Sequence, residues 1–358
     1  MLCAIRINLK PGYKKNIKKD LKKNKNISIM FTVEKMGVKY EFTIKFIIKD
    51  FGLQIKNLSS NQKNKKYLLA KIVQIIAFKN HNEKQSSTRF HYVDFPLPIK
   101  NNIPEKPSVS IVIPAYIKNK KDIANIENLL QSIEKQTIKP DHVIIVDDCS
   151  PVQYPFSKRI QLFKQPKNSG PAKARNLGKQ IAVENQSDII AFTDTDCLLS
   201  ENWIEIIIRS FHNLNDFQIL SGNTISYDKN WLGIYQNING TLNGRKFKDS
   251  ERLLYGTTAN LAITKEVAER INFNEVFPLA AGEDIEFCYR ANQIGFAIKH
   301  ISVMKIFHNY GYNNNLLHDL KLFYKQFKRY EKGQDTLLVE VPEYYTYFDN
   351  TIEIQASI

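Results

Sequence analysis

Cysteine is one of the scarcest residues in this chain of 358 residues. The four cysteines, Cys3, Cys149, Cys197 and Cys288, are scattered and show neither a CxxC pair nor another metal-ligand spacing. This pattern excludes a disulfide-rich secreted scaffold and suits a reducing compartment. We therefore predict a cytoplasmic location.

Long apolar runs are missing as well. No stretch approaches the roughly 20 apolar residues that a membrane-spanning helix needs. The start of the chain also lacks the basic region, apolar core and cleavage site of a secretory signal. The sequence predicts no membrane span.

Acidic residues are few only in the first third of the chain. Residues 1–107 hold 23 Lys and Arg against 7 Asp and Glu, a charge of +16, whereas residues 108–358 hold 28 against 29, a charge of −1. A basic surface can meet anionic lipid, nucleic acid or an acidic partner. A genome rich in A and T would also raise the share of Lys, Asn and Ile without functional meaning. The charge shift predicts an accessory domain and linker over 1–106, whose role stays open.

The N-terminal region carries patterns of both strand and helix. Residues 27–33 and 39–47 alternate and are rich in β-branched and aromatic residues, which predicts a hairpin around Met36-Gly37. Residues 66–77 place apolar side chains at helical spacing. Together they predict a small, basic α+β domain.

From Ser108 the pattern alternates between short apolar strands and amphipathic helices. Such an alternation indicates an α/β fold with a mostly parallel sheet covered on both faces. In these sheets, ligands bind beyond the carboxyl ends of the strands. The expected strands are 109–114, 142–148, 160–163 and 189–192, and the expected helices are 122–136, 171–184 and 202–211.

The acids Asp194 and Asp196 directly follow the apolar strand 189–192. In an extended backbone side chains alternate between faces, so both carboxylates point the same way. Two such acids repel each other unless a cation lies beside them, and Mg²⁺ and Mn²⁺ bind carboxylates together with substrate phosphates. The alternative is an ordinary polar turn.

Two other strand ends decide between these alternatives. Pro114-Ala-Tyr116 and Asp147-Asp148 each end a predicted strand. The carboxyl ends of parallel strands share one edge of the sheet, so these residues converge with the acid pair. The convergence favours a metal and diphosphate site.

Six segments occur in the order and at the spacing of a known family. They resemble the family 2 glycosyltransferases of the GT-A fold, and the resemblance runs from about Ser108 to His308. It implies a Rossmann-like GT-A catalytic domain over 107–312, followed by a C-terminal amphipathic helix and tail over 313–358. The segments are 109–116 (VSIVIPAY), 130–137 (LQSIEKQT), 143–150 (VIIVDDCS), 168–176 (NSGPAKARN), 194–196 (DTD) and 282–284 (GED).

The resemblance implies a binding site for a nucleotide-diphospho-sugar. Tyr116 would lie against the base, unless it is simply an exposed loop residue. Asp148 would accept a hydrogen bond from a uracil or guanine N–H, and a UDP-sugar is favoured. Arg175 would hold the nucleotide side. Asp194 and Asp196 would bind a divalent metal, Mn²⁺ or Mg²⁺, that offsets the charge on the leaving diphosphate.

Further residues of the donor site follow from the same resemblance. Pro114 and Asp194 would contact the nucleotide-sugar, and Asn260 would lie in the segment beneath the sugar and the acceptor. His308 follows the predicted strand 301–307. It would reach the metal or the diphosphate, or else be a polar turn residue.

The resemblance also implies the chemistry. Asp284 would be the base that takes the proton of the acceptor hydroxyl, and Glu283 would steady Asp284 or touch the sugar. One base and no protein nucleophile imply a single displacement with inversion at the anomeric carbon. The alternative is that both acids only favour the N-terminus of a helix electrostatically.

Residues 316–332 form an amphipathic helical pattern. Leu317, Leu320, Phe323, Tyr324 and Phe327 make one stripe, flanked by lysines and an arginine. A basic amphipathic helix can lie on the anionic cytoplasmic face of a membrane. It can equally pack on the domain with its lysines in solvent.

These features predict a metal-dependent inverting glycosyltransferase that moves a sugar to an acceptor hydroxyl on a glycan or lipid-linked intermediate, as in polysaccharide biosynthesis. One alternative is a sugar-nucleotide-binding protein without turnover. Another is a nucleic-acid-binding protein acting through the basic first third, which is disfavoured because no aromatic or Gly motif is interleaved there. The sugar, the acceptor and the oligomeric state do not follow from the sequence.

Overall fold

The chain divides into two compact units, residues 1–68 and 69–358. The predicted domains, 1–106, 107–312 and 313–358, remain a prediction. The structure is a computed structural model, and it describes residues 6–7, 27–35, 38–46, 65–77, 95–156 and 160–357.

The first unit contains a three-stranded antiparallel sheet in the order β1-β2-β3, with β1 at Arg6–Ile7. β2 (Ile27–Lys35) and β3 (Val38–Phe46) pair antiparallel along their whole length, as the alternating pattern predicts. The residues of the expected turn, Met36 and Gly37, lie outside the described part. α3 (Lys65–Ala77) matches the predicted helix within a residue and includes the boundary between the units.

The second unit alternates strands and helices as expected. The predicted helix at Pro171–Glu184 has the bounds of α5, and the other predicted helices begin within two residues of those observed. Its helices are α4 (Lys120–Glu134), α5 (Pro171–Glu184), α6 (Trp203–Asn213), α7 (Trp231–Ile238), α8 (Lys265–Arg270), α9 (Glu283–Gln293), α10 (Leu316–Glu340) and the 3-10 helix η4 (Tyr344–Asn350). Its strands are β4 (Val109–Ala115), β5 (His142–Asp147), β6 (Ile160–Lys164), β7 (Ile189–Thr193), β8 (Cys197–Leu199), β9 (Ile219–Ser226), β10 (Arg245–Phe247), β11 (Leu253–Tyr255), β12 (Asn260–Thr264), β13 (Ile298–His308) and β14 (Thr351–Glu353).

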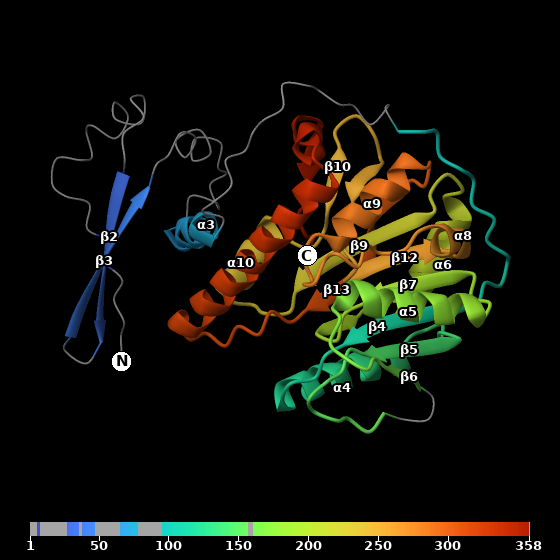
Figure 1. Ribbon diagram of the computed structural model, residues 1–358, viewed down its shortest axis with the longest axis horizontal. Coiled ribbons are helices and arrows are strands. Elements are labelled where there is room, and N and C mark those ends of the chain that lie inside the picture. Colours follow the sequence, from blue (N-terminus) through green and yellow to red (C-terminus); the bar gives the residue numbers. More distant parts are fainter. Residues whose placement is uncertain are drawn as a thin grey trace. The chain divides into compact units, whose positions relative to one another are not determined.

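An eight-stranded sheet, in the order β6-β5-β4-β7-β12-β9-β13-β8, forms the centre of this unit (Figure 1). The first four strands are parallel to one another, and β9 is parallel to β13. β12 runs antiparallel to β7 and β9, and β8 runs antiparallel to β13. The predicted α/β architecture with a mostly parallel sheet is confirmed.

Helices cover both faces of the sheet because successive strand residues point to opposite sides. Ile111 and Ile113 of β4 pack in one core cluster with α4 and α6. Val112, between them, packs in a second cluster with α5, α8 and α9. Burial on both faces explains why these strands read as continuous apolar runs.

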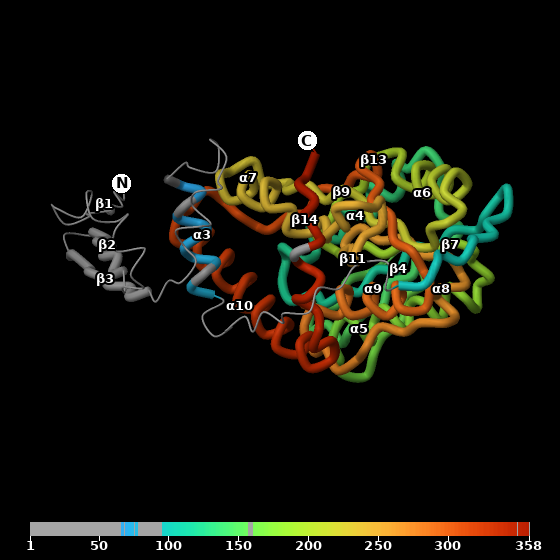
Figure 2. The backbone as a smooth tube through the Cα atoms, turned by 90° about the horizontal axis from the view of Figure 1, so that it is seen from above, coloured from blue at the N-terminus to red at the C-terminus, as the bar shows by residue number. Residues whose placement is uncertain are grey.

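Helix α10 lies beyond one end of the central strands and packs against α9 (Figures 1 and 2). It continues past the predicted end at Lys332 to Glu340, so Gly333 lies inside it. A Cβ at Gly333 would lie 2.3 Å from the carbonyl oxygen of Ala281, which shows how closely the helix approaches the start of α9. Phe323 and Phe327 are buried, whereas Leu317 and Tyr324 of the predicted stripe are exposed.

A second, three-stranded antiparallel sheet, in the order β11-β10-β14, ties the C-terminal segment to the domain. Among the described residues no helix combines the length and apolar character needed to cross a bilayer.

Candidate active site

A cavity of about 1110 Å³ opens beyond the carboxyl ends of β4, β5 and β7. The cavity brings together nearly all the residues predicted from the sequence, although they come from segments nearly 200 residues apart. Its lining includes Pro114, Tyr116, Asp148, Arg175, Asp194, Asp196, Glu283, Asp284 and His308.

Arg175 joins the two acidic motifs. Its side chain is only 2% exposed and donates from Nη2 to Asp194 Oδ1 at 2.9 Å and from Nη1 to Glu283 Oε1 at 2.8 Å. A buried guanidinium needs such partners, because an unpaired charge in the interior costs several kcal/mol. The sequence analysis predicted that Arg175 holds the nucleotide. In the structure both of its terminal nitrogens donate to protein carboxylates.

Asp196 and His308 form the second pair of the site. His308 Nε2 lies 3.3 Å from Asp196 Oδ1, because β13 pairs with β8 and sets Cys197 opposite His308. The two side chains are a candidate metal pair, and one ligand atom from each, together with the Cys197 sulfur, lies within 4.8 Å of the others. Burial raises the pKa of the Cys197 thiol well above its usual range, which disfavours a thiolate ligand.

The donor atoms of this pair fit a divalent cation. Carboxylates suit Mg²⁺ and Mn²⁺, and the added imidazole nitrogen suits Mn²⁺ better than the strictly oxygen-seeking Mg²⁺. Oδ1 of Asp194 accepts a hydrogen bond from Arg175. Among the described residues, none donates a hydrogen bond to Oδ2 of Asp194. That oxygen is the one Asp194 has left for a metal.

Asp148 closes the loop that begins α5. Its Oδ1 accepts from the Ser169 N–H at 2.7 Å, and its Oδ2 accepts from the Gly170 N–H at 2.8 Å. Burial raises the pKa of Asp148, and these hydrogen bonds act in the opposite direction. Each carboxylate oxygen can accept a second hydrogen bond, so the residue can hold the loop and still contact a ligand.

Tyr116 and Pro114 lie where β4 ends. Tyr116 is 42% exposed and lines the cavity, and the Lys118 ammonium lies 5.5 Å from the centroid of its ring. An aromatic face open to a cavity can stack on a planar ring. Pro114 lines the same wall.

Glu283 and Asp284 begin α9 after Gly282, whose φ of +93° favours glycine. Glu283 is 2% exposed, and its Oε2 is buried without a hydrogen-bond partner in the structure. A buried acceptor of this kind calls for an explanation, and Glu283 is among the residues that line the cavity. A ligand hydroxyl could donate to it.

Asp284 has a perturbed carboxyl group. Its Oδ1 accepts from the Ile285 N–H at 2.9 Å and its Oδ2 from the Thr258 N–H at 3.4 Å. Burial first, and then the neighbouring charge of Glu283, raise the pKa of Asp284 to about 7, against the opposing charge of Arg175. A carboxylate with a pKa near neutrality is suited to take and release protons.

Asn260 is not brought to the cavity. It is fully buried, its Oδ1 accepts from the Trp203 indole N–H at 2.8 Å, and its Nδ2 donates to the Met304 carbonyl at 2.9 Å. Its amide joins β12, α6 and β13. The neighbouring residues Thr257, Thr258 and Ala259 line the cavity instead.

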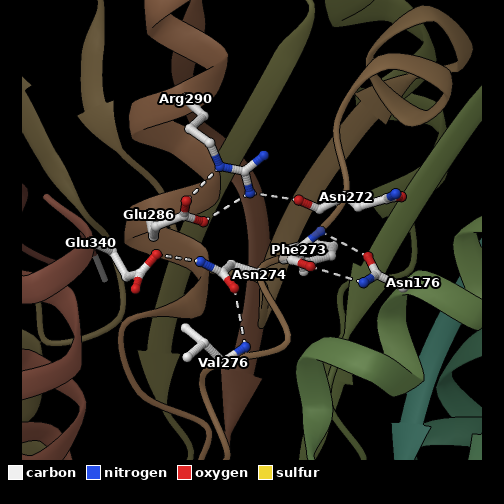
Figure 3. Close-up of polar contacts among 8 residues, drawn as sticks. All are labelled: Asn176, Asn272, Phe273, Asn274, Val276, Glu286, Arg290 and Glu340. Carbon is white, nitrogen blue, oxygen red and sulfur yellow. Dashed lines mark hydrogen bonds and ion pairs between the residues drawn. The ribbon is translucent and has the colours of Figure 1, made fainter.

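The segment leading to Gly282 is fixed by polar contacts from three helices (Figure 3). The Asn176 amide of α5 exchanges two hydrogen bonds with the backbone of Phe273, at 2.9 and 2.7 Å. Asn274 donates to Glu340 of α10 at 2.8 Å, and Arg290 of α9 donates to the Asn272 carbonyl at 2.6 Å. These contacts set where α9 begins and therefore where Glu283 and Asp284 lie.

Sequence reasoning missed one wall of the cavity. α10 and η4 contribute side chains that include Arg329, Tyr330, Tyr344, Tyr345 and Phe348. The Tyr345 and Phe348 ring centroids lie 5.0 Å apart, and the Arg245 guanidinium lies 4.0 Å from the Phe348 ring. The density of aromatic residues in 344–348 is visible in the sequence and could have pointed to this wall.

The profile of the family described as Glycosyl transferase family 2 matches residues 110–276. This stretch contains Tyr116, Asp148, Arg175 and the acids of the 194–196 motif. Residues 110–276 form a family 2 glycosyltransferase domain. The predicted family is confirmed, and the observed α/β sheet is the one expected for its GT-A fold.

Curated relatives match parts of the chain. An uncharacterized glycosyltransferase of Haemophilus influenzae is 33% identical over 114 residues, which is 30% of this chain and 36% of that protein. The succinoglycan biosynthesis protein ExoW of Rhizobium meliloti is 35% identical over 99 residues, 25% of this chain and 29% of that protein. The chain thus spans about a third of the length of these relatives.

Solved structures resemble the chain more loosely. TarS 1–349 of S. aureus in complex with UDP is 17% identical, with a TM-score of 0.45 over 67% of this chain and 72% of that chain. The mannosyltransferase PcManGT of Pyrobaculum calidifontis with GDP-Man and Mn²⁺ is 14% identical, with a TM-score of 0.44 over 80% of each chain. These scores are too low to assign a ligand to this chain.

Proposed function

We propose that the chain is a metal-dependent inverting glycosyltransferase. It transfers a sugar from a nucleoside-diphospho-sugar, with UDP favoured, to an acceptor hydroxyl on a glycan or lipid-linked intermediate. One observation carries the proposal: a single cavity is lined by the candidate metal pair, Asp196 and His308, and by the perturbed carboxylate of Asp284. Arg175 pairs with the neighbours of these acids, Asp194 and Glu283.

The donor would occupy the cavity between the candidate metal pair and Asp284. Tyr116 and Asp148 would face the nucleotide base, and Asp196, His308 and the second oxygen of Asp194 would hold the metal. When bound, the metal offsets the charge that develops on the leaving diphosphate. The unpartnered Oε2 of Glu283 would accept a hydrogen bond from a hydroxyl of the donor sugar.

Asp284 would act as the base. It takes the proton of the acceptor hydroxyl while that oxygen bonds to the anomeric carbon, and the bond between this carbon and the diphosphate oxygen breaks. The nucleoside diphosphate leaves with the bonding electron pair. No nucleophilic Ser, Cys or Lys is needed, so one displacement inverts the configuration at the anomeric carbon.

The aromatic side chains of η4 support a carbohydrate acceptor. Tyr344, Tyr345 and Phe348 line the same cavity as Asp284, and aromatic faces offer apolar area that the C–H face of a sugar ring can cover. The name of the Rhizobium relative, a succinoglycan biosynthesis protein, fits an acceptor used in polysaccharide biosynthesis. Cytoplasmic location and contact of α10 with a membrane surface stay predictions.

A thermal-shift series tests the donor and the metal together. UDP and GDP, each with and without Mn²⁺, are added to the wild-type chain, to Asp196→Asn and to Asp216→Asn, a control at an exposed acid. We expect a nucleoside diphosphate with Mn²⁺ to raise Tm by a few degrees in the wild type and the control, because a saturating ligand stabilises by about 2.7 kcal/mol at a hundred times its Kd. Asp196→Asn should lose this rise. Indifference of the wild type to every nucleotide would contradict the proposal.

A further inference from the structure

A second cavity, of about 740 Å³, lies beside α5. Its walls come from the end of β6, from α5, from α8 and from the segment that follows α8. Among the described residues, the lining of this cavity has no member in common with the lining of the candidate active site. Its volume is that of an ordinary site for a small molecule. The cavity beside α5 is therefore a place where a different ligand can bind.

The amide of Gln165 is buried at this cavity without a partner. Gln165 directly follows β6, lines the cavity and is only 4% exposed. Within the described part of the chain, neither its Oε1 nor its Nε2 has a hydrogen-bond partner. Burying an amide without hydrogen bonds is costly, so such groups are normally satisfied. An amide both donates and accepts, which matches the hydroxyl groups of a ligand.

Lys179 adds a buried cation to the same cavity. It lies on α5, is 4% exposed, and its ammonium donates to the carbonyl of Ala268 in α8. An ammonium has three donors, so this contact leaves two of them for other partners. Burial lowers the pKa of Lys179 to about 8, and no carboxylate offsets this effect. An anion in the cavity would supply the counter-charge that the protein does not.

The other charges around the cavity divide into unpaired lysines and engaged acids. Lys164 and Lys173 are exposed and form no ion pair within the described residues. Each of the three acids has a protein partner: Glu184 accepts from Gln180 at 2.9 Å, Glu275 accepts from Asn176 at 3.0 Å, and Glu269 lies 4.0 Å from the ammonium of Lys265. The charge that this cavity leaves unpaired is therefore positive.

We propose that the cavity beside α5 is a second binding site, which takes a small hydroxylated phosphate such as a free sugar phosphate. The phosphate would bind Lys179, and Lys164 and Lys173 would add charge at the rim, because ammonium groups hold phosphate as point charges. Hydroxyl groups of the ligand would donate to Oε1 and accept from Nε2 of Gln165. The inference is independent of the proposed function.

The cavity borders an element that supports the active site. Asn176 lines the cavity and exchanges two hydrogen bonds with the backbone of Phe273 (Figure 3). Phe273 belongs to the segment that leads to Glu283 and Asp284 at the start of α9. A ligand in the cavity would therefore contact α5 and this segment together, and we expect it to slow hydrogen exchange in both.

Calorimetry on the whole chain tests the inference with four probes: glucose 6-phosphate, glycerol 3-phosphate, glucose and inorganic phosphate. The variants are Gln165→Leu and Lys179→Met, which keep most of the side-chain volume. Lys167→Met is the matched control, because Lys167 is an exposed lysine two residues from Gln165 that does not line the cavity. Asp196→Asn, in the candidate active site, separates the two cavities.

We expect the wild-type chain to bind a phosphate ester at least tenfold more tightly than inorganic phosphate, and to bind glucose more weakly still. Gln165→Leu and Lys179→Met should each weaken binding of the ester about tenfold or more, since hydrogen bonds to charged groups have roughly this effect. Lys167→Met and Asp196→Asn should bind as the wild type does. Without ligand, Gln165→Leu should melt at a higher temperature than the wild type, because it removes a buried amide that has no partner.

Hydrogen exchange then locates the bound ester, with slower exchange expected in residues 173–184 and 268–276. Four results would overturn the inference and leave the proposed function untouched. These are no binding of either phosphate ester, equal affinity for the esters and inorganic phosphate, wild-type affinity in both Gln165→Leu and Lys179→Met, and loss of binding in Asp196→Asn. The last result would assign the ester to the candidate active site instead.

Discussion

At the scale of single residues, the site depends on acids held in unfavourable surroundings. Glu283 and Asp284 lie side by side at the start of α9, and Arg175 pairs with the first of them only. The burial of Asp284 and, after it, the like charge of Glu283 favour the protonated form of Asp284. The surroundings that suit Asp284 to act as a base therefore also lower the stability of the fold when Asp284 is ionised.

The first prediction concerns Asp284→Asn. A base must be ionised, so wild-type transfer should fall as the pH drops below about 7, and Asp284→Asn should reduce transfer by about a hundredfold or more at every pH while UDP still binds. Stability should respond with the opposite sign. The raised pKa means that protonated Asp284 favours the folded state. This contribution is fully present below the ordinary carboxyl pKa of 3.8 and is lost as the pH rises from there to about 7.

Melting curves at pH 5 and pH 8 check the stability part of this prediction. Asp284→Asn should exceed the Tm of the wild type by more at pH 8 than at pH 5, because the neutral amide avoids a cost of ionisation that grows between these two pH values. Equal differences at both pH values would show that Asp284 does not titrate in this range. Full transfer by the variant would show that another group is the base.

The second prediction concerns Arg175, whose removal leaves two carboxylates without their cation. Arg175→Met should cost about 3–5 kcal/mol of unfolding free energy, the usual effect of breaking a buried ion pair from one side. Arg209→Met is the control, since Arg209 is 74% exposed in its pair with Glu205 and should contribute less than about 1 kcal/mol. Urea unfolding measures both, and similar losses for the two variants would contradict the prediction.

At the scale of elements, the packing of α10 on the start of α9 is the contact that completes the cavity. Gly333 of α10 meets Ala281, and a Cβ there would lie 2.3 Å from the Ala281 carbonyl oxygen and 2.4 Å from its Cβ. α9 and α10 are successive helices, separated in the chain by β13. The distance between α9 and α10 therefore depends on Gly333, which has no side chain.

The third prediction is that Gly333→Ala destabilises the chain although alanine favours helix. In an open helix the change would stabilise by up to about 1 kcal/mol. Here the methyl group must push α10 away from Ala281, which should cost about 1–3 kcal/mol and lower kcat/KM by displacing the wall that faces Asp284. Lys332→Ala, one residue earlier and exposed, should do neither. A stabilised and fully active Gly333→Ala would show that the helices can separate freely.

At the scale of the whole molecule, the two units differ in charge and in their part in the site. The basic excess belongs to residues 1–107, whereas the cavity is lined only from Lys71 onward among the described residues. Lys71 and Gln74 of α3 contribute to its wall, and Gln74 also accepts a hydrogen bond from the Tyr235 hydroxyl. The beginning of the second unit is therefore part of the candidate site.

The fourth prediction compares two truncations. A chain that starts at Lys65 keeps α3 complete and should retain transfer nearly unchanged, because it keeps every described residue of the cavity. A chain that starts at Phe95 loses Lys71 and Gln74 and should transfer more slowly. Steady-state kinetics on both, with circular dichroism to confirm folding, decides between them. Loss of transfer in the longer chain would assign the first unit a direct role.

The sequence by itself determined the four parallel strands β4 to β7, most helix positions and the edge of the sheet at which the site lies. Continuous apolar runs ending in Tyr116, Asp148 and Asp194 contain that information locally, because a buried strand must be apolar and its carboxyl end faces the crevice. The sequence did not determine the length of α10. Gly333 reads as the end of a helix, and only the close contact with Ala281 explains why a glycine lies inside α10.

Only the tertiary structure decided which charges are paired. Arg175 and Glu283 are 108 residues apart, so nothing local reveals that they share a hydrogen bond or that Asp194 joins them. The same holds for Asn260, which lies in the expected segment but points into the core between Trp203 and Met304. The wall formed by α10 and η4 depends likewise on long-range packing. A sequence pattern fixes what a segment can bury, whereas the partner of each polar atom depends on which segments the fold brings together.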